Sequence, residues 1–195
     1  MEVSFIGATT NAEEIIKLAI SQCYQQPAST TVLRHCISAG HLSVLEHAMA
    51  TFKISVSLQT LLQLTRHRHL SFTCQSTRGS LIDEVETTGV EVVDETNSAT
   101  LQIYRALVQS GNASLEEAAL MLPKAMTYNL VVSGNFRVWY EYLPKRMCKR
   151  AQTEHRALAE SIQYELMIRY PNIFKGVKAP CDKCKEKGCE FHNGK

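Results

Sequence analysis

The chain has no strong excess of charge of either sign. Its formal net charge is only +2 at pH 7, from 21 lysines and arginines against 19 aspartates and glutamates. Proteins that coat nucleic acid usually carry a basic excess or a basic stripe, so this balance argues against that class. We therefore expect the arginines to serve a small anion locally and predict no nucleic-acid partner.

Long apolar runs are also missing. No stretch approaches the roughly 18 apolar residues that a membrane span needs, and we predict no membrane association. The first residues lack the basic start and apolar core of a signal peptide. The seven cysteines are an odd number, which fits reduced thiols better than a disulfide framework. Together these observations predict a cytoplasmic protein.

Two glycine-rich nucleotide motifs are absent. No GxGxxG and no GxxxxGK follows a predicted strand, so neither the Rossmann fingerprint nor a P-loop is present. A length of 195 residues, with 45% hydrophobic and 21% charged residues, is ordinary for one globular domain. We place this domain at residues 1–175 and treat residues 176–195 as a cysteine-rich tail.

Hydrophobic periodicity predicts helices that alternate with a few strands, and hence an α/β or α+β domain. Strands are predicted at residues 3–6, 48–56 and 126–133, and residues 80–96 form an acidic surface connection. Asn11 is the expected N-cap of the first helix, while Gly40 and Gly111 end two others. The predicted helices are 12–24, 31–39, 58–65, 99–108, 115–122, 136–142 and 151–168.

The most informative segment is residues 66–78, which read RHRHLSFTCQSTR. Guanidinium groups bind phosphate with two parallel hydrogen bonds and keep their charge, so converging arginines indicate an anionic ligand. If the chain is extended here, Arg66 and Arg68 share one face and His67 takes the other. The alternative for RHR alone is a solvated basic turn.

The spacing of this segment and three others resembles the flavin-dependent thymidylate synthases. Seven residues separate RHR from Ser76, and Arg78 follows two residues later. The other matching segments are GHLSVLEH at 40–47, Leu122-Pro123 with VVSGNFRVW at 131–139, and Arg146 with the helix start at 151–154. The resemblance covers most of residues 30–175.

This resemblance implies an antiparallel sheet flanked by helices in a homotetramer whose subunits share active sites. It also implies the reductive methylation of dUMP to dTMP, with methylenetetrahydrofolate as carbon donor, NADPH as reductant and FAD as hydride carrier. The flavin carries the hard chemistry in such an enzyme, and the protein supplies position and electrostatics.

The resemblance also assigns roles to single residues. The residues implied to bind FAD are His41, Ser43, Glu46, Arg66, His67, Arg68, Asn135 and Arg137. Those implied to bind dUMP are Gln63, Arg66, Gln75, Ser76, Thr77, Arg78 and Arg146. Arg146 is the implied catalytic residue, because a fixed cation stabilises negative charge on the pyrimidine when its N3 proton leaves.

Ser76 has two interpretations. A nucleophilic serine needs a base, for which His67 and His69 are candidates. Since a reduced flavin can carry the chemistry, we prefer a hydroxyl that orients the uracil. Trp139 and Tyr142, three residues apart, are predicted to be core residues rather than a stacking platform.

The chain departs from the family pattern at four positions. Cys74 replaces a usual glutamate, Gly79 a tyrosine, and Ala119 an arginine that reaches dUMP. Glu141 stands where a neutral or basic residue commonly meets the flavin. These changes leave open an alternative flavoprotein that acts on another pyrimidine nucleotide. Lys124 is a candidate substitute for the missing arginine.

The tail contains Cys181, Cys184, Cys189 and His192, four soft ligands chemically suited to tetrahedral zinc. The alternative is a flexible, reduced tail rich in lysine. A zinc-like tail next to a basic RHRH segment also defines a rival function, a nucleic-acid-binding module, which the near-neutral charge disfavours.

Overall fold

A four-stranded antiparallel sheet forms the centre of the protein, in a computed structural model that describes residues 1–182, 184, 186–187 and 189–191. The strands lie in the order β1-β2-β4-β3. Their bounds are β1 Glu2–Ala8, β2 Met49–Ser57, β3 Ser71–Cys74 and β4 Thr127–Asn135. The prediction of a mixed fold with an antiparallel sheet and flanking helices is confirmed.

Alternation of side chains decides which sheet face is buried. Along β2, Phe52, Ile54 and Val56 are at most 1% exposed, whereas Lys53 between them points to solvent. This two-residue period is typical of a sheet packed on one face only.

β2 pairs with β4 over its whole length, from Met49 opposite Asn135 to Ser57 opposite Thr127.

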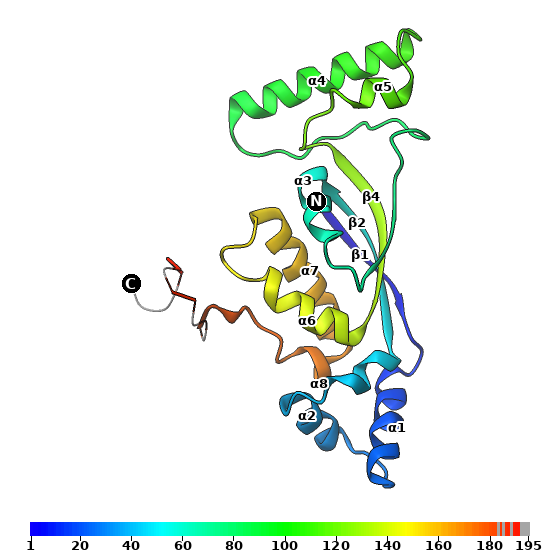
Figure 1. Ribbon diagram of the computed structural model, residues 1–195, viewed down its shortest axis with the longest axis vertical. Coiled ribbons are helices and arrows are strands. Elements are labelled where there is room, and N and C mark those ends of the chain that lie inside the picture. The colour runs from blue at the N-terminus through cyan, green and yellow to red at the C-terminus, as the bar shows by residue number, and fades with distance from the viewer. Residues whose placement is uncertain (183, 185, 188, 192–195) are drawn as a thin grey trace.

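Helices α6 (Phe136–Arg146) and α7 (Thr153–Arg169) cover the buried face (Figure 1). Trp139 of α6 is completely buried, and its indole N–H donates to the carbonyl of Ala50 at 3.2 Å. Tyr142, one turn later, is 1% exposed, so the prediction that both aromatic residues belong to the core is confirmed. Short helices continue α7: α8 (Pro171–Phe174) and the 3-10 turn η2 (Pro180–Asp182).

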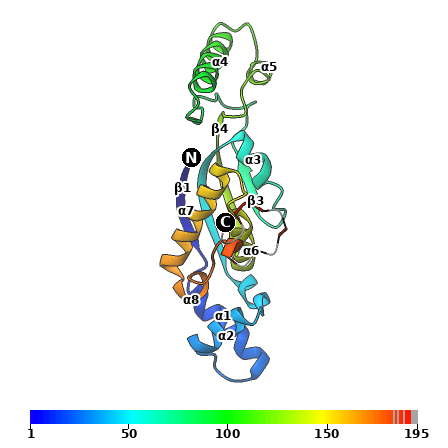
Figure 2. The same cartoon turned by 90° about the vertical axis from the view of Figure 1, so that its left-hand side faces the viewer.

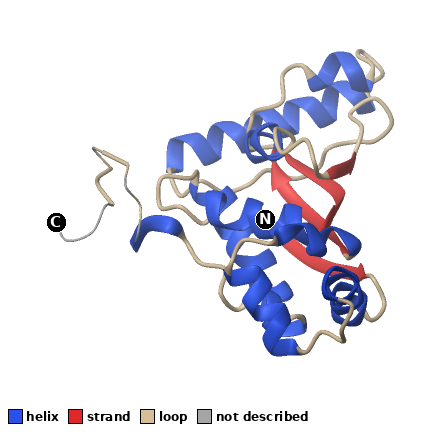
Figure 3. Ribbon diagram, turned by 60° about the horizontal axis from the view of Figure 1, so that its bottom comes forward, coloured by secondary structure: helices blue, strands red, loops and turns tan. Residues whose placement is uncertain are grey.

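The remaining helices lie at the two ends of an elongated molecule (Figures 1 and 2). One end carries α1 (Ala12–Tyr24) and α2 (Thr30–Ser38), followed by the 3-10 helix η1 (Leu42–His47). The other end carries α4 (Glu91–Gln109) and α5 (Leu115–Ala119), while α3 (Leu58–Leu64) follows β2 directly. Figure 3 shows the helices gathered on one side of the small sheet and at its two ends.

The α4–α5 end has a hydrophobic cluster of its own, formed by Ile82, Leu101, Tyr104, Ala118 and Met126. This cluster is separate from the main core under the sheet. The Tyr104 hydroxyl, fully buried, accepts from the backbone N–H of Ile82 at 3.3 Å. The loop before α4 is thereby fixed to the end cluster.

Several predicted boundaries differ from the structure. α4 begins at Glu91, so the acidic connection predicted at 80–96 is partly helix. The reason is Asp94, whose carboxylate accepts from the N–H groups of Thr88 at 2.8 Å and Gly89 at 3.0 Å and so organises the helix start. α5 ends at Ala119 rather than at residue 122, and the edge strand β3 was not predicted.

The three residues predicted to lie at helix ends are found there. Gly40 and Gly111 adopt left-handed backbone conformations, with φ of 82° and 72°. Asn11 is the N-cap of α1 as predicted, and its backbone carbonyl accepts from the N–H groups of Glu14 and Ile15, although its φ is 54° and its side chain makes no capping hydrogen bond. Among the described residues, no helix is both sufficiently long and sufficiently apolar to span a bilayer.

Candidate active site

The Arg-His-Arg segment forms a tight turn after α3. The backbone N–H of His67 donates to the carbonyl of Leu64 at 3.0 Å, and that of Arg68 to Arg66 at 3.1 Å. The segment is therefore not extended, because the last helix carbonyls find their donors within the turn, and the two faces considered for an extended chain do not apply. Arg66 and Arg68 are exposed, whereas His67 is half-buried. The two guanidinium groups therefore lie in solvent, and the imidazole lies partly inside the protein.

His67 contacts Arg146, the last residue of α6. The guanidinium Nε donates to His67 Nε2 at 2.8 Å. Because arginine has no acceptor, His67 is neutral here, with a bare Nε2 and its proton on Nδ1. Burial, then the nearby charges of Arg146 and Lys145, lower the pKa of His67 to about 4. Two motif segments, 79 positions apart in the chain, thus meet at one hydrogen bond.

A buried polar pair lies behind this bond. The rings of His67 and Tyr142 meet edge-on at 4.8 Å, and the Tyr142 hydroxyl lies 3.0 Å from Nε2 of His155. His155 is completely buried, and its Nδ1 has no hydrogen-bond partner among the described residues. Burial, with smaller effects of Arg146 and His67, lowers the pKa of His155 to about 3, and burial raises that of Tyr142.

Sequence reasoning missed His155, although a signal was present. His155 begins a buried stripe on α7 that continues with Leu158, Ile162 and Leu166. This spacing places one titratable side chain on the core face of an amphipathic helix. A histidine on such a face either has a polar partner or stays neutral.

The other five predicted flavin residues form a second group where η1 packs against α6. Glu46 of η1 and Glu141 of α6 both accept from Arg137, at 2.5 Å and 2.8 Å. The carboxylates of Glu141 and Glu46 raise the pKa of Arg137. Asn135 caps α6, since its side-chain oxygen accepts from the N–H of Val138 at 2.9 Å. The structure therefore gives Glu141 a partner, Arg137.

His41 and Ser43 lie at the start of η1, and both are exposed. They share the η1 segment with Glu46. The structure thus places Ser43 and Glu46 on η1 and His41 directly before it, with all three side chains exposed.

The predicted substrate residues follow β3. Gln75 pairs with Asn129 of β4, whose backbone N–H donates to the Gln75 side-chain oxygen at 3.3 Å. The Ser76 hydroxyl accepts from the N–H of Arg78 at 3.2 Å, which closes a local turn around Thr77. Arg78 reaches the α4–α5 end, where its Nε lies 3.1 Å from the carboxylate of Glu116. This group is separate from the His67–Arg146 pair.

Among the described residues, no hydrogen bond joins Ser76 to His67 or His69. A nucleophilic serine needs a base at its hydroxyl, so this arrangement disfavours a nucleophile, and the ligand-orienting role of Ser76 stays a prediction. Partial burial raises the pKa of the neighbouring Cys74 thiol, which disfavours a thiolate there as well.

Gln63 belongs to a third group, at the starts of α3 and α7. Its side-chain N–H donates to Gln152 at 3.1 Å, and Gln152 also accepts from Thr60 at 2.8 Å. The Thr60 hydroxyl donates at 2.6 Å to Glu154. Gln63 is therefore held from α7, the helix that also carries His155.

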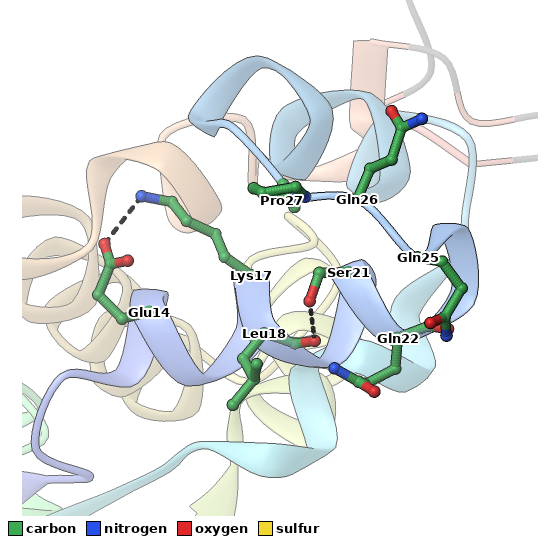
Figure 4. Close-up of a pocket in the computed structure, with 9 residues that line it drawn as sticks. Glu14, Lys17, Leu18, Ser21, Gln22, Gln25, Gln26 and Pro27 are labelled. Atoms are coloured by element: carbon green, nitrogen blue, oxygen red, sulfur yellow. Dashed lines mark hydrogen bonds and ion pairs between the residues drawn. The ribbon is translucent and has the colours of Figure 1, made fainter.

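The hollows on the surface differ in what they can hold. The hollow beside His67 measures about 50 Å³, enough for water but far below the several hundred Å³ of small-molecule sites. A larger hollow of about 670 Å³ lies between α7 and the α4–α5 end and is lined by Gln152, Glu154, Asn97 and Lys124, among others. Another, of about 550 Å³, lies on α1 and is lined by Lys17 and Ser21, with no predicted site residue (Figure 4).

Cys181, at the start of the cysteine cluster, lies against the connection between α6 and α7. Cys181 is 5% exposed, and its thiol accepts from the backbone N–H of Lys149 at 3.3 Å. Within the described residues, no three His, Cys, Asp or Glu side chains come together as metal ligands. His192, the fourth predicted ligand, lies outside the described residues, so the zinc site and the boundary at residue 176 stay predictions.

Comparisons with known proteins agree on one family. The family model described as thymidylate synthase complementing protein matches residues 4–172. A flavin-dependent thymidylate synthase of Sulfurisphaera tokodaii is 30% identical over 93% of this chain and 79% of its own length. That of Corynebacterium glutamicum is also 30% identical, over 89% of this chain and 82% of its own.

Solved structures give the same fold. The flavin-dependent thymidylate synthase of Helicobacter pylori, complexed with FAD and dUMP, superposes with a TM-score of 0.83. The superposition covers 91% of this chain and 100% of that one, at 22% sequence identity. At this identity the likeness supports the fold alone.

Proposed function

Because the chain belongs to the thymidylate synthase complementing protein family, we propose that it converts dUMP to dTMP by reductive methylation. The chain is an enzyme of the flavin-dependent methyltransferase class. In the proposed reaction, methylenetetrahydrofolate donates the carbon and NADPH supplies the reducing equivalents. The observation that carries the proposal is the Arg146–His67 bond, which brings two separate motif segments to one place.

The exposed side chains fit an FAD molecule. Arg66 and Arg68 present two guanidinium groups in one turn, a donor set that matches a pyrophosphate. Arg137 and the side-chain amide nitrogen of Asn135 would hold another part of the cofactor. When bound, the flavin supplies the hydride-transfer chemistry.

The chain itself supplies charge and orientation to dUMP. Arg146 stabilises the negative charge that develops on the pyrimidine when its N3 proton is lost. Arg78 neutralises the phosphate, and the Ser76 hydroxyl orients the base. Gln63 and Gln75, both already held by hydrogen bonds, would complete the substrate contacts without further ordering cost.

We also propose a homotetramer with shared sites, as the family resemblance implies. The hollow beside His67 is too small for FAD, while the flavin residues on η1 and the Arg66–Arg68 turn are exposed. A cofactor held by such residues needs a second surface to exclude water. The measurement is the molecular mass in solution by light scattering. A monomer that still binds FAD and forms dTMP would rule out shared sites.

A second candidate function is methylation of another pyrimidine nucleotide. It is favoured by two departures from the family pattern, Ala119 in place of an arginine that reaches dUMP and Cys74 in place of a glutamate. Glu116, which pairs with Arg78, further weakens the binding expected for the phosphate of dUMP. Lys124, which lines the 670 Å³ hollow, is the candidate substitute cation.

The deciding experiment is spectroscopic. The purified protein is reconstituted with FAD, reduced by NADPH without oxygen in the presence of dUMP, and then mixed with methylenetetrahydrofolate. Flavin absorption that bleaches and recovers while dTMP forms is the expected result. Bound flavin without dTMP would favour another nucleotide, and failure to bind FAD would contradict the proposed function and leave the nucleic-acid-binding alternative standing.

A further inference from the structure

Three side chains behind Arg146 form a continuous chain of contacts into the core. We infer that His67, Tyr142 and His155 are positioning residues that hold the Arg146 guanidinium in its working orientation. The inference rests on the proposed role of Arg146 in dUMP activation. It also assigns His67 a role besides the flavin contact that the family resemblance implies.

The first argument is the cost of the buried pair. Tyr142 carries one hydroxyl hydrogen and neutral His155 carries one N–H, but only one hydrogen bond joins them, at 3.0 Å. Whichever tautomer His155 adopts, one hydrogen of the pair lacks an acceptor within the described residues. Two apolar side chains would fill this space without that penalty. Since the Tyr142–His155 pair leaves a buried hydrogen without an acceptor, its role is functional rather than stabilising.

The second argument is the geometry that Arg146 demands of His67. The bond of 2.8 Å exists only if Nε2 is bare and faces the guanidinium. The Tyr142 ring meets the imidazole edge-on at 4.8 Å with an interplanar angle of 87°, which restricts its rotation. His155 in turn fixes the hydroxyl end of Tyr142. A flipped imidazole would present its other edge, and the guanidinium would lose its acceptor.

The third argument concerns charge. The groups that face His67 are Arg146, Lys145 and Tyr142 of α6 and His155 of α7, with Glu141 and His69 lining the adjacent hollow. Burial and the two cations disfavour a second positive charge, so His67 stays neutral through the neutral pH range. A protonated His67 would place an N–H against the guanidinium donor and release Arg146.

The kinetic test compares two replacements of His67 in the FAD-loaded enzyme. His67→Leu removes the acceptor and should lower kcat by about 10- to 100-fold. His67→Gln offers a side-chain oxygen to Arg146 and cannot titrate. The His67→Gln variant should recover most of the wild-type kcat. Its kcat should not fall at acidic pH in the way that the wild-type kcat does. Equal losses in both variants, with FAD binding lost in parallel, would overturn the inference and leave His67 as a flavin contact only.

The test of the buried pair uses Tyr142→Phe, which removes one oxygen. We expect kcat to fall about fivefold to tenfold while FAD affinity stays within about twofold, because only the orientation of His67 is affected. Tyr104→Phe is the matched control, since Tyr104 is equally buried but bonds to Ile82 in the other cluster. An unchanged kcat in Tyr142→Phe, or the same fall in Tyr104→Phe, would contradict the inference.

A second readout does not depend on turnover. Nitrogen-15 NMR of the FAD-loaded protein at pH 7 should show His67 with its proton on Nδ1, and Tyr142→Phe should show a mixture of tautomers. A proton on Nε2 in the wild type, or an unaltered tautomer in Tyr142→Phe, overturns the inference. If dTMP never forms, the proposed function fails, but the NMR result still decides whether the contact chain orients Arg146.

Discussion

The carboxylate of Glu154 accepts hydrogen bonds from both the backbone N–H and the side-chain hydroxyl of Ser57. Ser57 is the N-cap of α3, and Glu154 lies in the first turn of α7, so the two helix starts are fixed to each other. The same carboxylate accepts from Thr60 at 2.6 Å. This arrangement places Gln152 beside Gln63, and α3 then leads directly into the Arg66–Arg68 turn.

Glu154→Ala should therefore destabilise the protein by about 2–3 kcal/mol. Ser57 and Thr60 are 4% and 0% exposed, and removal of the carboxylate leaves the Ser57 hydroxyl without its acceptor and the Thr60 hydroxyl with Gln152 alone. The measurement is urea denaturation at pH 7, with Glu160→Ala on the exposed face of α7 as control. A loss below about 0.5 kcal/mol in Glu154→Ala would show that water replaces the carboxylate.

Much of this fold could be predicted because its elements have clear periodic patterns. The core strands β2 and β4 and the helix α7 alternate buried and exposed side chains at strand or helix spacing. The four-residue strand β3 could not be predicted in this way. It is held by its pairing with β4, a long-range relationship that a local pattern does not contain.

The candidate site was predictable in composition but not in its groupings. The motif spacing supplied the residues, yet only the structure shows that Arg146 meets His67 while Arg78 meets Glu116. These contacts join positions that are far apart in the chain. Tyr142 and His155 were not predicted as a pair, because a buried polar pair is defined by packing between two helices.

Arg146→Ala should lower kcat for dTMP formation by about 10²- to 10³-fold, with FAD still bound. Arg146→Lys should recover little of this loss, because lysine lacks the guanidinium Nε that donates to His67 and is a flexible point charge. Rates are measured under saturating dUMP, with the flavin spectrum as the check on cofactor binding. A near wild-type rate in Arg146→Ala would disprove the catalytic assignment.

Glu116→Gln should tighten dUMP binding by about twofold to fivefold. The pair of Glu116 with Arg78 is exposed, and a bound phosphate has to compete with the carboxylate for the guanidinium. The dUMP affinity is measured by titration calorimetry of the FAD-loaded protein. Glu165→Gln is the control, since that carboxylate pairs with Arg169 on α7. Unchanged affinity in Glu116→Gln would indicate that Arg78 does not reach the phosphate.

Ala119→Arg should also tighten dUMP if the phosphate lacks a cation. Residue 119 follows Glu116 by three positions, so a new arginine would pair with that carboxylate in the wild-type background. The gain should therefore be larger in the Glu116→Gln background than alone. Weaker or unchanged dUMP binding in the double variant would show that the phosphate does not lack a cation at position 119.

Gly134→Ala should destabilise the protein by about 1–3 kcal/mol. A Cβ at this position of β4 would lie 2.4 Å from Leu70 Cδ2 and 3.3 Å from Trp139 Nε1, inside the main core. Gly176→Ala is the control, because a Cβ there meets nothing within 4 Å. Stability is measured by thermal unfolding, and equal melting temperatures for the two variants would contradict the packing argument.

Stability should fall between pH 7 and pH 5, and His155 should account for about 2 kcal/mol of that fall. The folded state keeps His155 neutral, since its pKa is lowered to about 3, whereas the unfolded chain takes up a proton near the ordinary value of 6.5. The unfolded state thus binds more protons as the pH drops through 6.5, and this favours unfolding until the folded pKa is reached.

Urea denaturation at pH 7 and pH 5 should show a smaller fall in stability in His155→Leu than in the wild type. His35→Leu, on the exposed side of α2, should keep the wild-type difference. An identical fall in His155→Leu would mean that the neutral, buried state of His155 does not control acid stability.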